Sequence, residues 1–371
     1  MIVYKEIFQT YNLGMKALTL CFIFICSSNL FSKECDFRSP IKTYRPQYAT
    51  HFSIKYFSHF KIVSVDDNQY LLTNKSELGC DTTIPKIVSP VKRIVMMSTT
   101  YLPALEILKQ EKTLVGFQGK HYIVSKAFNI DKIIDISFKF NPEFLINLKA
   151  DLIMGSDSNL TAENQKIIFS KLNLPVTINK DFEETSPLAR AEWLIYISSF
   201  FDQEEVAITF FKSIEKKYLA IKANNLKLSK KIDVLVGEIQ NGMWVTCGEQ
   251  SDLGKMIEDA GGTLALSRPS ALTQTLSLEI LSKNKKSFDL WLTHNNWSSK
   301  IERDEAMKKD SRYSMIKANK TYNNNLLVNK FNSNDFWETG LQRPDLLLLD
   351  LSLLFHPENY SGLSPHWYRS I

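Results

Sequence analysis

A short amphipathic helix that carries a glutamate, followed by a turn, an aspartate and a buried strand, occurs twice in this chain. The first copy spans residues 141–155 and contains Glu143; the second spans residues 277–293 and contains Glu279. A helix that leads into a fully apolar strand is the repeating unit of a parallel α/β sheet. Two such units, far apart in one chain, predict two similar lobes with a cleft between them.

Length and composition agree with two globular domains. The chain has 371 residues, of which 44% are hydrophobic, so two medium-sized cores can form. The formal net charge of +5 is modest for this length, and most lysines are scattered along the sequence. Because nucleic-acid binding needs a concentrated basic surface, we do not expect a nucleic-acid partner.

The N-terminal segment, residues 1–32, has the layout of a secretory signal peptide, with Met15 as an alternative start. Its apolar run, residues 17–26, is too short to span a bilayer comfortably, and small and polar residues follow as far as Ser32. We therefore expect cleavage near Ser32 and export to the periplasm. Lipid attachment at Cys35 is left open, although Lys33 and Glu34 do not suit a lipid-attachment motif.

Three cysteines remain after the leader: Cys35, Cys80 and Cys247. An exported chain favours disulfide formation, and the pairing that we predict is Cys35 with Cys80. Three unpaired thiols are the alternative. The spacings match no zinc motif, so no metal site is predicted.

The order of patterns divides the rest of the chain into four parts. Alternating apolar and polar residues predict a β-rich extension before the first lobe, and a long helix-forming stretch, broken near residues 201–203, predicts a connector between the lobes. The fold class is therefore α/β, with two Rossmann-like lobes of parallel sheet joined by one long helix. The predicted parts are the N-terminal extension (33–90), the first lobe (91–187), the helical connector (188–229) and the second lobe (230–371).

In the order of their sequence patterns, residues 91–357 resemble the periplasmic substrate-binding proteins of ABC importers for iron-siderophores, haem and cobalamin. The resemblance rests on Val91–Val95, the two glutamate phrases, the connector, Trp337-Glu338 and Arg343-Pro344-Asp345. It implies a monomer that captures a metal chelate or corrinoid between its lobes and delivers it to a permease in the inner membrane. It implies no turnover and no cofactor. Residues 33–90 lie outside the common fold.

The resemblance also implies a role for the repeated glutamates. In the family, one surface glutamate on each lobe forms a salt bridge with arginines of the permease, and Glu143 and Glu279 stand at the matching places. The alternative is local, because an acidic residue near a helix N-terminus gains roughly 0.3 to 1 kcal/mol from the helix dipole.

Ligands of open α/β sheets bind beyond the carboxyl ends of the strands, so the loops that follow strands supply the candidates. Broad, partly aromatic and often anionic chelates would bind indole and phenol faces, a few donors and basic groups. Besides Arg190, the candidate basic groups are Lys120 and Arg343. His121 and His294 alone make only a weak case for direct metal ligation. Packing within a lobe is the alternative for each tryptophan. The predicted ligand-binding residues are Thr100, Tyr101, Tyr122, Arg190, Trp244, Trp297, Asn334 and Trp337.

A periplasmic enzyme or a ligand-sensing module on the same scaffold is the alternative function. The sequence contains no G-x-S-x-G elbow, no H-E-x-x-H helix and no phosphate-binding G-x-x-x-x-G-K-[ST] loop. We therefore expect a binding protein and no enzyme.

Overall fold

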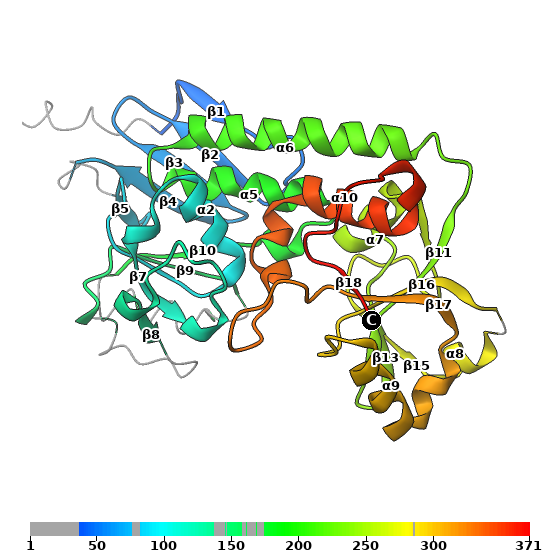
Figure 1. Cartoon of the computed structure of the whole chain (residues 1–371). Coiled ribbons are helices and arrows are strands. Elements are labelled where there is room, and N and C mark those ends of the chain that lie inside the picture. The colour runs from blue at the N-terminus through cyan, green and yellow to red at the C-terminus, as the bar shows by residue number, and fades with distance from the viewer. Residues whose placement is uncertain are drawn as a thin grey trace, which may run out of the picture.

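The chain folds into two α/β lobes that lie side by side beneath a long helix (Figure 1). The computed structural model describes residues 37–75, 82–136, 145, 147–157, 161, 168, 174–284 and 286–371. The predicted signal peptide, both partners of the predicted disulfide and Glu143 lie outside the described residues. In the part of the chain that is described, no helix is both long and apolar enough to cross a membrane.

The N-terminal lobe is built on a parallel five-stranded sheet with the order β10-β9-β6-β7-β8. Its inner strands are short and almost entirely apolar, as expected when both faces of a parallel sheet are covered. Helix α2 (Leu102–Ile107) follows the first strand. The strands are β6 (Ile94–Met96), β7 (Leu114–Gln118), β8 (Ile134–Ile136), β9 (Leu152–Gly155) and β10 (Val176–Ile178).

The C-terminal lobe repeats this plan with the sheet order β14-β11-β16-β17-β18, in which only β18 is antiparallel. A small antiparallel sheet, β12-β13-β15, is added to it. The strands are β11 (Ile232–Val236), β12 (Glu238–Gln240), β13 (Met243–Thr246), β14 (Gly262–Leu264), β15 (Gln274–Ser277), β16 (Phe288–Thr293), β17 (Ala318–Asn323) and β18 (Arg369–Ser370). The helices are α7 (Asp252–Asp259), α8 (Glu279–Lys283), α9 (Lys300–Lys309) and α10 (Pro344–Phe355).

Two consecutive helices connect the lobes. Helix α5 (Pro187–Ser199) is almost completely buried, whereas α6 (Glu204–Asn225) runs along the outside from one lobe to the other (Figure 1). Between them the chain turns at Asp202, whose φ of 56° is left-handed. The inner face of α6 buries Ala207, Phe211 and Ile214, with the spacing of an amphipathic helix. The helical connector and its break follow the sequence pattern.

The N-terminal extension forms a separate five-stranded sheet with the sequential order β1-β2-β3-β4-β5. It packs on the connector: Phe52 of β2 lies with its ring centroid 5.1 Å from Trp193 and 5.8 Å from Tyr196, both on α5. The Tyr70 hydroxyl also accepts a hydrogen bond from the N–H of Ile178 in the first lobe. The strands are β1 (Lys42–Tyr44), β2 (Phe52–Tyr56), β3 (Lys61–Val65), β4 (Asn68–Thr73) and β5 (Lys86–Val88), antiparallel except for the parallel pair β4-β5.

A buried carboxylate on α5 fixes the segment that precedes β2. Glu192, which is 1% exposed, accepts hydrogen bonds from the backbone N–H groups of Gln47, Tyr48 and Ala49 at 2.8 to 2.9 Å. Its Oε1 atom also accepts one from the Tyr44 hydroxyl at 2.8 Å. Hydrogen bonds to a charged acceptor are stronger than neutral ones, so Glu192 joins the extension firmly to the connector.

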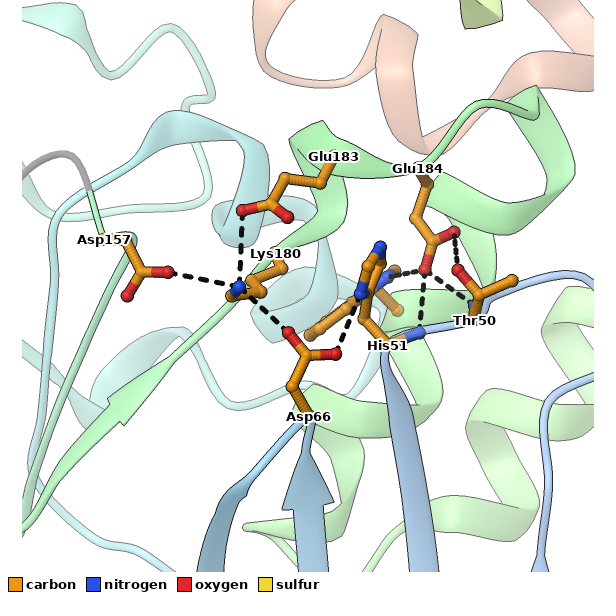
Figure 2. Close-up of polar contacts among 8 residues, drawn as sticks. Thr50, His51, Asp66, Asp157, Lys180, Glu183 and Glu184 are labelled. Atoms are coloured by element: carbon orange, nitrogen blue, oxygen red, sulfur yellow. Dashed lines mark hydrogen bonds and ion pairs between the residues drawn. The ribbon is translucent and has the colours of Figure 1, made fainter. Parts of the chain in front are cut away.

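A second carboxylate, that of Glu184, contacts the residues that follow directly in the same segment (Figure 2). It accepts hydrogen bonds from the N–H of Thr50 at 2.9 Å and from the indole Nε1 of Trp193 at 3.1 Å. Beside it, the Lys180 ammonium lies 2.9 Å from Asp66 of the extension and 3.3 Å from Asp157 of the first lobe (Figure 2). These contacts join the extension to the carboxyl edge of the N-terminal sheet.

Replacing Glu192 by alanine should leave several buried donors without an acceptor, because water cannot reach them. We expect Glu192→Ala to lower the free energy of unfolding by about 2–4 kcal/mol, measured by urea denaturation. Glu205→Ala is the control, since Glu205 is 83% exposed on α6, and it should change stability by less than about 0.5 kcal/mol. Equal effects of the two variants would contradict the anchoring role.

Candidate ligand-binding cleft

A cleft of about 800 Å³ lies between the lobes, where the carboxyl ends of strands from both sheets meet. The N-terminal lobe contributes residues that follow β6 and β7, including Ser98, Thr99 and Tyr122. The opposite wall comes from loops after β16 and β17 and from the 3-10 helix η7 (Asp335–Trp337). The volume lies within the usual range of small-molecule sites, roughly 300–1,000 Å³.

The C-terminal wall of the cleft is dominated by side-chain amides. Six asparagines are found among the described lining residues: Asn295, Asn296, Asn324, Asn325, Asn332 and Asn334. Several of these side chains form hydrogen bonds with one another or with the backbone. The Asn334 Nδ2 atom donates to the Oδ1 of Asn324 at 3.1 Å, and the Asn325 Nδ2 donates to the carbonyl of Trp297 at 3.0 Å.

Two of these amides have one end without a protein partner. They are the Nδ2 of Asn324 and the Oδ1 of Asn325, one donor and one acceptor on consecutive residues that both line the cleft. Asn324 is only 1% exposed. Leaving a buried polar group unpaired costs about 1–3 kcal/mol, so each of these two atoms calls for an explanation.

Formal charge in the cleft is low and balanced. Among the described residues, its lining contains one acidic residue, Glu302, and one arginine, Arg369. The Arg369 guanidinium donates to the backbone carbonyls of Ser298, Asn325 and Leu326 at 2.6 to 3.2 Å. Its Nη atoms therefore join the loops of the C-terminal wall, whereas its Nε has no hydrogen-bond partner among the described residues.

A second chamber of about 390 Å³ adjoins the first and lies against α5, α7 and α10. Its lining is more apolar, with Val236, Met256 and Leu347 among its residues, and the chambers share His294 and Trp337. The ring centroids of His294 and Trp337 are 5.5 Å apart. Burial lowers the pKa of His294 to about 4, so the imidazole is neutral at physiological pH.

Direct metal ligation by the protein finds no support in the described residues. His294 lines the cleft, but His121 is not among the lining residues, and its ring stacks near Tyr122 with centroids 4.1 Å apart. No group of three or more His, Cys, Asp or Glu side chains that could hold a metal ion occurs in the described part of the chain.

A segment of the C-terminal lobe crosses the cleft and binds a loop of the N-terminal lobe. The buried Glu338 carboxylate accepts hydrogen bonds from the backbone N–H groups of Val124 at 2.7 Å and Ser125 at 2.9 Å. The Asn329 side chain donates to the carbonyls of His121 and Ile123, both at 2.9 Å. We call these contacts the cross-lobe clasp. Burial, followed by the neighbouring charges of Asp335 and Glu106, raises the pKa of Glu338 to about 7 despite its two backbone donors.

Some predicted ligand residues do lie in the cleft. Tyr122 and Trp337 line it from opposite lobes, 46% and 43% exposed, and Asn334 lines it beside Trp337. Thr99 lines the cleft, whereas its predicted neighbour Thr100 is not among the lining residues. The Thr100 hydroxyl is hydrogen-bonded to Ser98 Oγ at 3.0 Å.

Other predicted residues are placed elsewhere, and here the sequence interpretation was wrong. Tyr101 and Trp244 are fully buried in the cores of their lobes. Each packs within an apolar cluster, which the neighbouring residues in the sequence do not reveal. Trp297 packs against Trp291 and Tyr313, with ring centroids 5.7 and 5.3 Å apart, and is not among the lining residues. These three assignments fail because a polar flank does not show where a side chain points.

The basic groups that were expected to hold an anion have protein partners. Arg190 lines the second chamber, but its Nη1 atom lies 2.8 Å from Asp252, and its Nη2 lies 3.8 Å from Asp181. Lys120 donates to the carbonyls of Ile130 and Ile133, both at 3.3 Å. Arg343 pairs with Asp345, with Nε and Oδ1 2.8 Å apart.

Sequence reasoning missed the asparagines that follow β17 and the role of Glu338. A signal for the first was present, because Asn324 and Asn325 directly follow the strand β17, where α/β proteins place ligand contacts. No sequence signal showed that Glu338 reaches the opposite lobe, since its partners are more than 200 residues away.

Comparison with known proteins identifies the family. A family model described as a periplasmic binding protein matches residues 94–324. This match covers more than half of the chain, so the protein belongs to that family, and the resemblance drawn from the sequence is confirmed. The family consists of binding proteins, in agreement with the expectation that the chain is no enzyme.

Solved structures share the two-lobed fold. A periplasmic haem-binding protein from Pseudomonas aeruginosa matches with a TM-score of 0.56 and 15% identity over 76% of this chain and 98% of that one. A possible iron-binding (periplasmic solute-binding) protein from Staphylococcus epidermidis matches with a TM-score of 0.54 and 19% identity, over 72% and 99%. An uncharacterized lipoprotein of Methanocaldococcus jannaschii is 25% identical over 317 residues, 79% of this chain and 72% of that protein.

The raised pKa of Glu338 predicts a pH dependence of stability. The ordinary pKa of 4.5 rises to about 7 in the folded protein, so the folded state holds this proton more tightly than the unfolded chain does. The contribution of Glu338 to the free energy of unfolding is thus greatest below pH 4.5 and is lost as the pH rises toward about 7, a change on the order of 3 kcal/mol.

Glu338→Gln removes the titrating group and keeps its size. We expect the stability of wild type relative to this variant to fall between pH 4.5 and pH 7, as measured by urea denaturation. Taking this difference cancels the opposite contribution of His294, whose lowered pKa reduces stability below about pH 6.5. Glu305→Gln, an exposed change on α9, is the matched control. Parallel pH profiles for wild type and Glu338→Gln would contradict the assignment.

Proposed function

We propose that this protein is an exported solute-binding protein that captures a metal chelate between its lobes and delivers it to an ABC permease in the inner membrane. The observation that carries the proposal is a cleft of about 800 Å³ lined by both lobes at the carboxyl ends of their strands. Family membership and the titles of the structural neighbours, which include haem-binding and iron-binding proteins, support it.

The proposed location is extracytoplasmic. It is supported by the signal-peptide pattern in residues 1–32 and by the name of the relative from Methanocaldococcus jannaschii, a lipoprotein. The proposed chelate is a siderophore, haem or a corrinoid, each with a broad face that the exposed rings of Tyr122 and Trp337 could contact from opposite sides of the cleft.

Delivery requires a surface that the permease can bind. Glu279, in the first turn of α8, is 73% exposed, and among the described residues it forms an ion pair with Lys283, with Oε2 and Nζ 3.2 Å apart. Such an exposed pair contributes little to stability, so this carboxylate is free to exchange its lysine for an arginine of a partner. Glu143 is proposed as its counterpart on the first lobe.

Ligand binding is tested by thermal unfolding of the purified protein with ferric siderophores, haem and cobalamins. A ligand that binds only the folded state stabilises it by about 2.7 kcal/mol at one hundred times its Kd, so at least one chelate should raise the Tm by several degrees. Trp337→Ala should reduce that shift, whereas Leu219→Ala, on the exposed face of α6, should preserve it. If no chelate shifts the Tm, the proposed function fails.

Docking is tested by charge reversal. Glu279→Lys should leave the chelate Kd within about twofold of wild type, because α8 lies outside both chambers, and should slow chelate uptake by cells that express the importer. Glu205→Lys reverses an equally exposed first-turn glutamate, on α6, and should leave uptake unchanged. Unchanged uptake with Glu279→Lys would exclude its role in docking.

A further inference from the structure

We propose that the ligand is a chelate that carries an apolar arm, and that the second chamber binds this arm while the main cleft binds the chelate itself. The inference rests on the proposed function and narrows its ligand class. The second chamber, of about 390 Å³, is itself within the size range of small-molecule sites, roughly 300–1,000 Å³, so it has room for a substantial part of a ligand.

The first argument is that the two chambers meet at one group of rings. Trp337 and His294 line both chambers, and Phe336 lines the second. The ring centroid of Trp337 lies 4.8 Å from that of Phe336 and 5.5 Å from that of His294. Because Trp337 is 43% exposed, a chelate that contacts it in the main cleft also lies at the border of the second chamber. An arm attached to that chelate can therefore extend into the second chamber.

The second argument is the contrast between the two linings. Side-chain amides dominate the C-terminal wall of the main cleft, whereas aliphatic side chains from several elements line the second chamber. Contact with apolar surface favours a ligand in proportion to the apolar area that is removed from water. The aliphatic residues come from β11, β13, α7, the 3-10 helix η8 (Gly340–Gln342) and α10, and they are Val236, Val245, Leu253, Met256, Leu341 and Leu347.

The charged side chains of the second chamber do not favour an anionic arm. Among its described lining residues they are Arg190, Glu238 and Asp252, one guanidinium against two carboxylates. Arg190 and Asp252 form an ion pair, with Nη1 and Oδ2 2.8 Å apart, and the Nε atom of Arg190, which has no hydrogen-bond partner, is buried. An apolar arm leaves this ion pair intact, whereas a carboxylate would be repelled by Glu238 and Asp252.

The third argument is that the second chamber has exposed apolar side chains, which an arm would cover. Phe182, in the 3-10 helix η5 (Asp181–Glu183) beside the N-terminal sheet, and Leu272, in the loop before β15 of the C-terminal lobe, both line it. They are 49% and 74% exposed. An apolar arm bound here would remove part of this surface from water. Since the two residues belong to opposite sides of the cleft, such an arm can contact both.

The experiment measures affinity against the length of an alkyl chain attached to three chelates. The probes are ferrioxamine B acylated on its amine, cobalamin acylated on its ribose hydroxyl and haem esterified on one propionate, each with a two-, six- or eight-carbon chain. Kd values are measured by quenching of intrinsic tryptophan fluorescence, with calorimetry as the second readout. For at least one chelate we expect Kd to fall by roughly threefold for each added methylene, as burial of a CH₂ group predicts.

Two variants test whether the second chamber holds the chain. Leu272→Asp places a charge, and Ala271→Trp a large ring, at exposed positions of its lining, where folding should tolerate them. Each should reduce the ratio of the two-carbon Kd to the eight-carbon Kd by roughly fivefold or more. Leu226→Asp, at a leucine that is 66% exposed and lies outside both chambers, is the matched control and should preserve the ratio. Thermal unfolding without ligand establishes that each variant is folded.

The outcomes separate the two proposals. Chelates that bind with a Kd independent of chain length would overturn the apolar arm and leave the solute-binding function standing. Failure of every probe in both readouts would overturn both proposals. If the chain-length dependence is the same in wild type, Leu272→Asp and Ala271→Trp, the assignment to the second chamber is overturned. Binding of 1-octanol alone as tightly as the eight-carbon chelates would indicate an independent apolar site and would also overturn the inference.

Discussion

The cross-lobe clasp determines the geometry on which the ligand site depends. Glu338 accepts hydrogen bonds from two consecutive N–H groups of the opposite lobe, and Asn329 donates to two carbonyls of the same loop. Because Trp337 and Asn334 belong to the same segment, the clasp places them opposite Tyr122 and gives the cleft its second wall. A buried carboxylate also makes this junction sensitive to pH near neutrality, in a class of protein whose task is to bind and then release.

The N-terminal extension stabilises the helical connector between the two lobes that the clasp joins. Glu192 on α5 and Glu184 just before it accept hydrogen bonds from backbone N–H groups of the segment before β2. At the start of α6, the Glu204 Oε1 atom lies 2.6 Å from the Lys61 Nζ atom of β3. Both connector helices are therefore held from outside by a domain that the family match, residues 94–324, does not include. Helices supported in this way resist bending, which favours small relative motions of the lobes.

The chemistry of the cleft differs from what aromatic residues in the sequence suggested. Three of the predicted aromatic contacts, Tyr101, Trp244 and Trp297, pack inside their lobes, and the exposed rings are those of Tyr122 and Trp337. Asparagine amides fill the remaining wall. Amides provide direction without charge, so the site can be specific for donor and acceptor patterns, while Glu302 and Arg369 together add no net formal charge.

The sequence alone determined the class of fold, because hydrophobic periodicity and strand-ending loops are local properties: the repeated helix-strand units, the helical connector with its break and the β-rich extension all follow from spacing along the chain. It also pointed to the carboxyl edge of each sheet, where the cleft lies. Only the tertiary structure decided which side chains reach that edge. The burial of Trp244, the pairing of Arg190 with Asp252 and the contact of Glu338 with Val124 depend on distant segments of the chain. The paired residues are 62 and 214 positions apart, and no local pattern encodes the direction in which a side chain meets a distant partner.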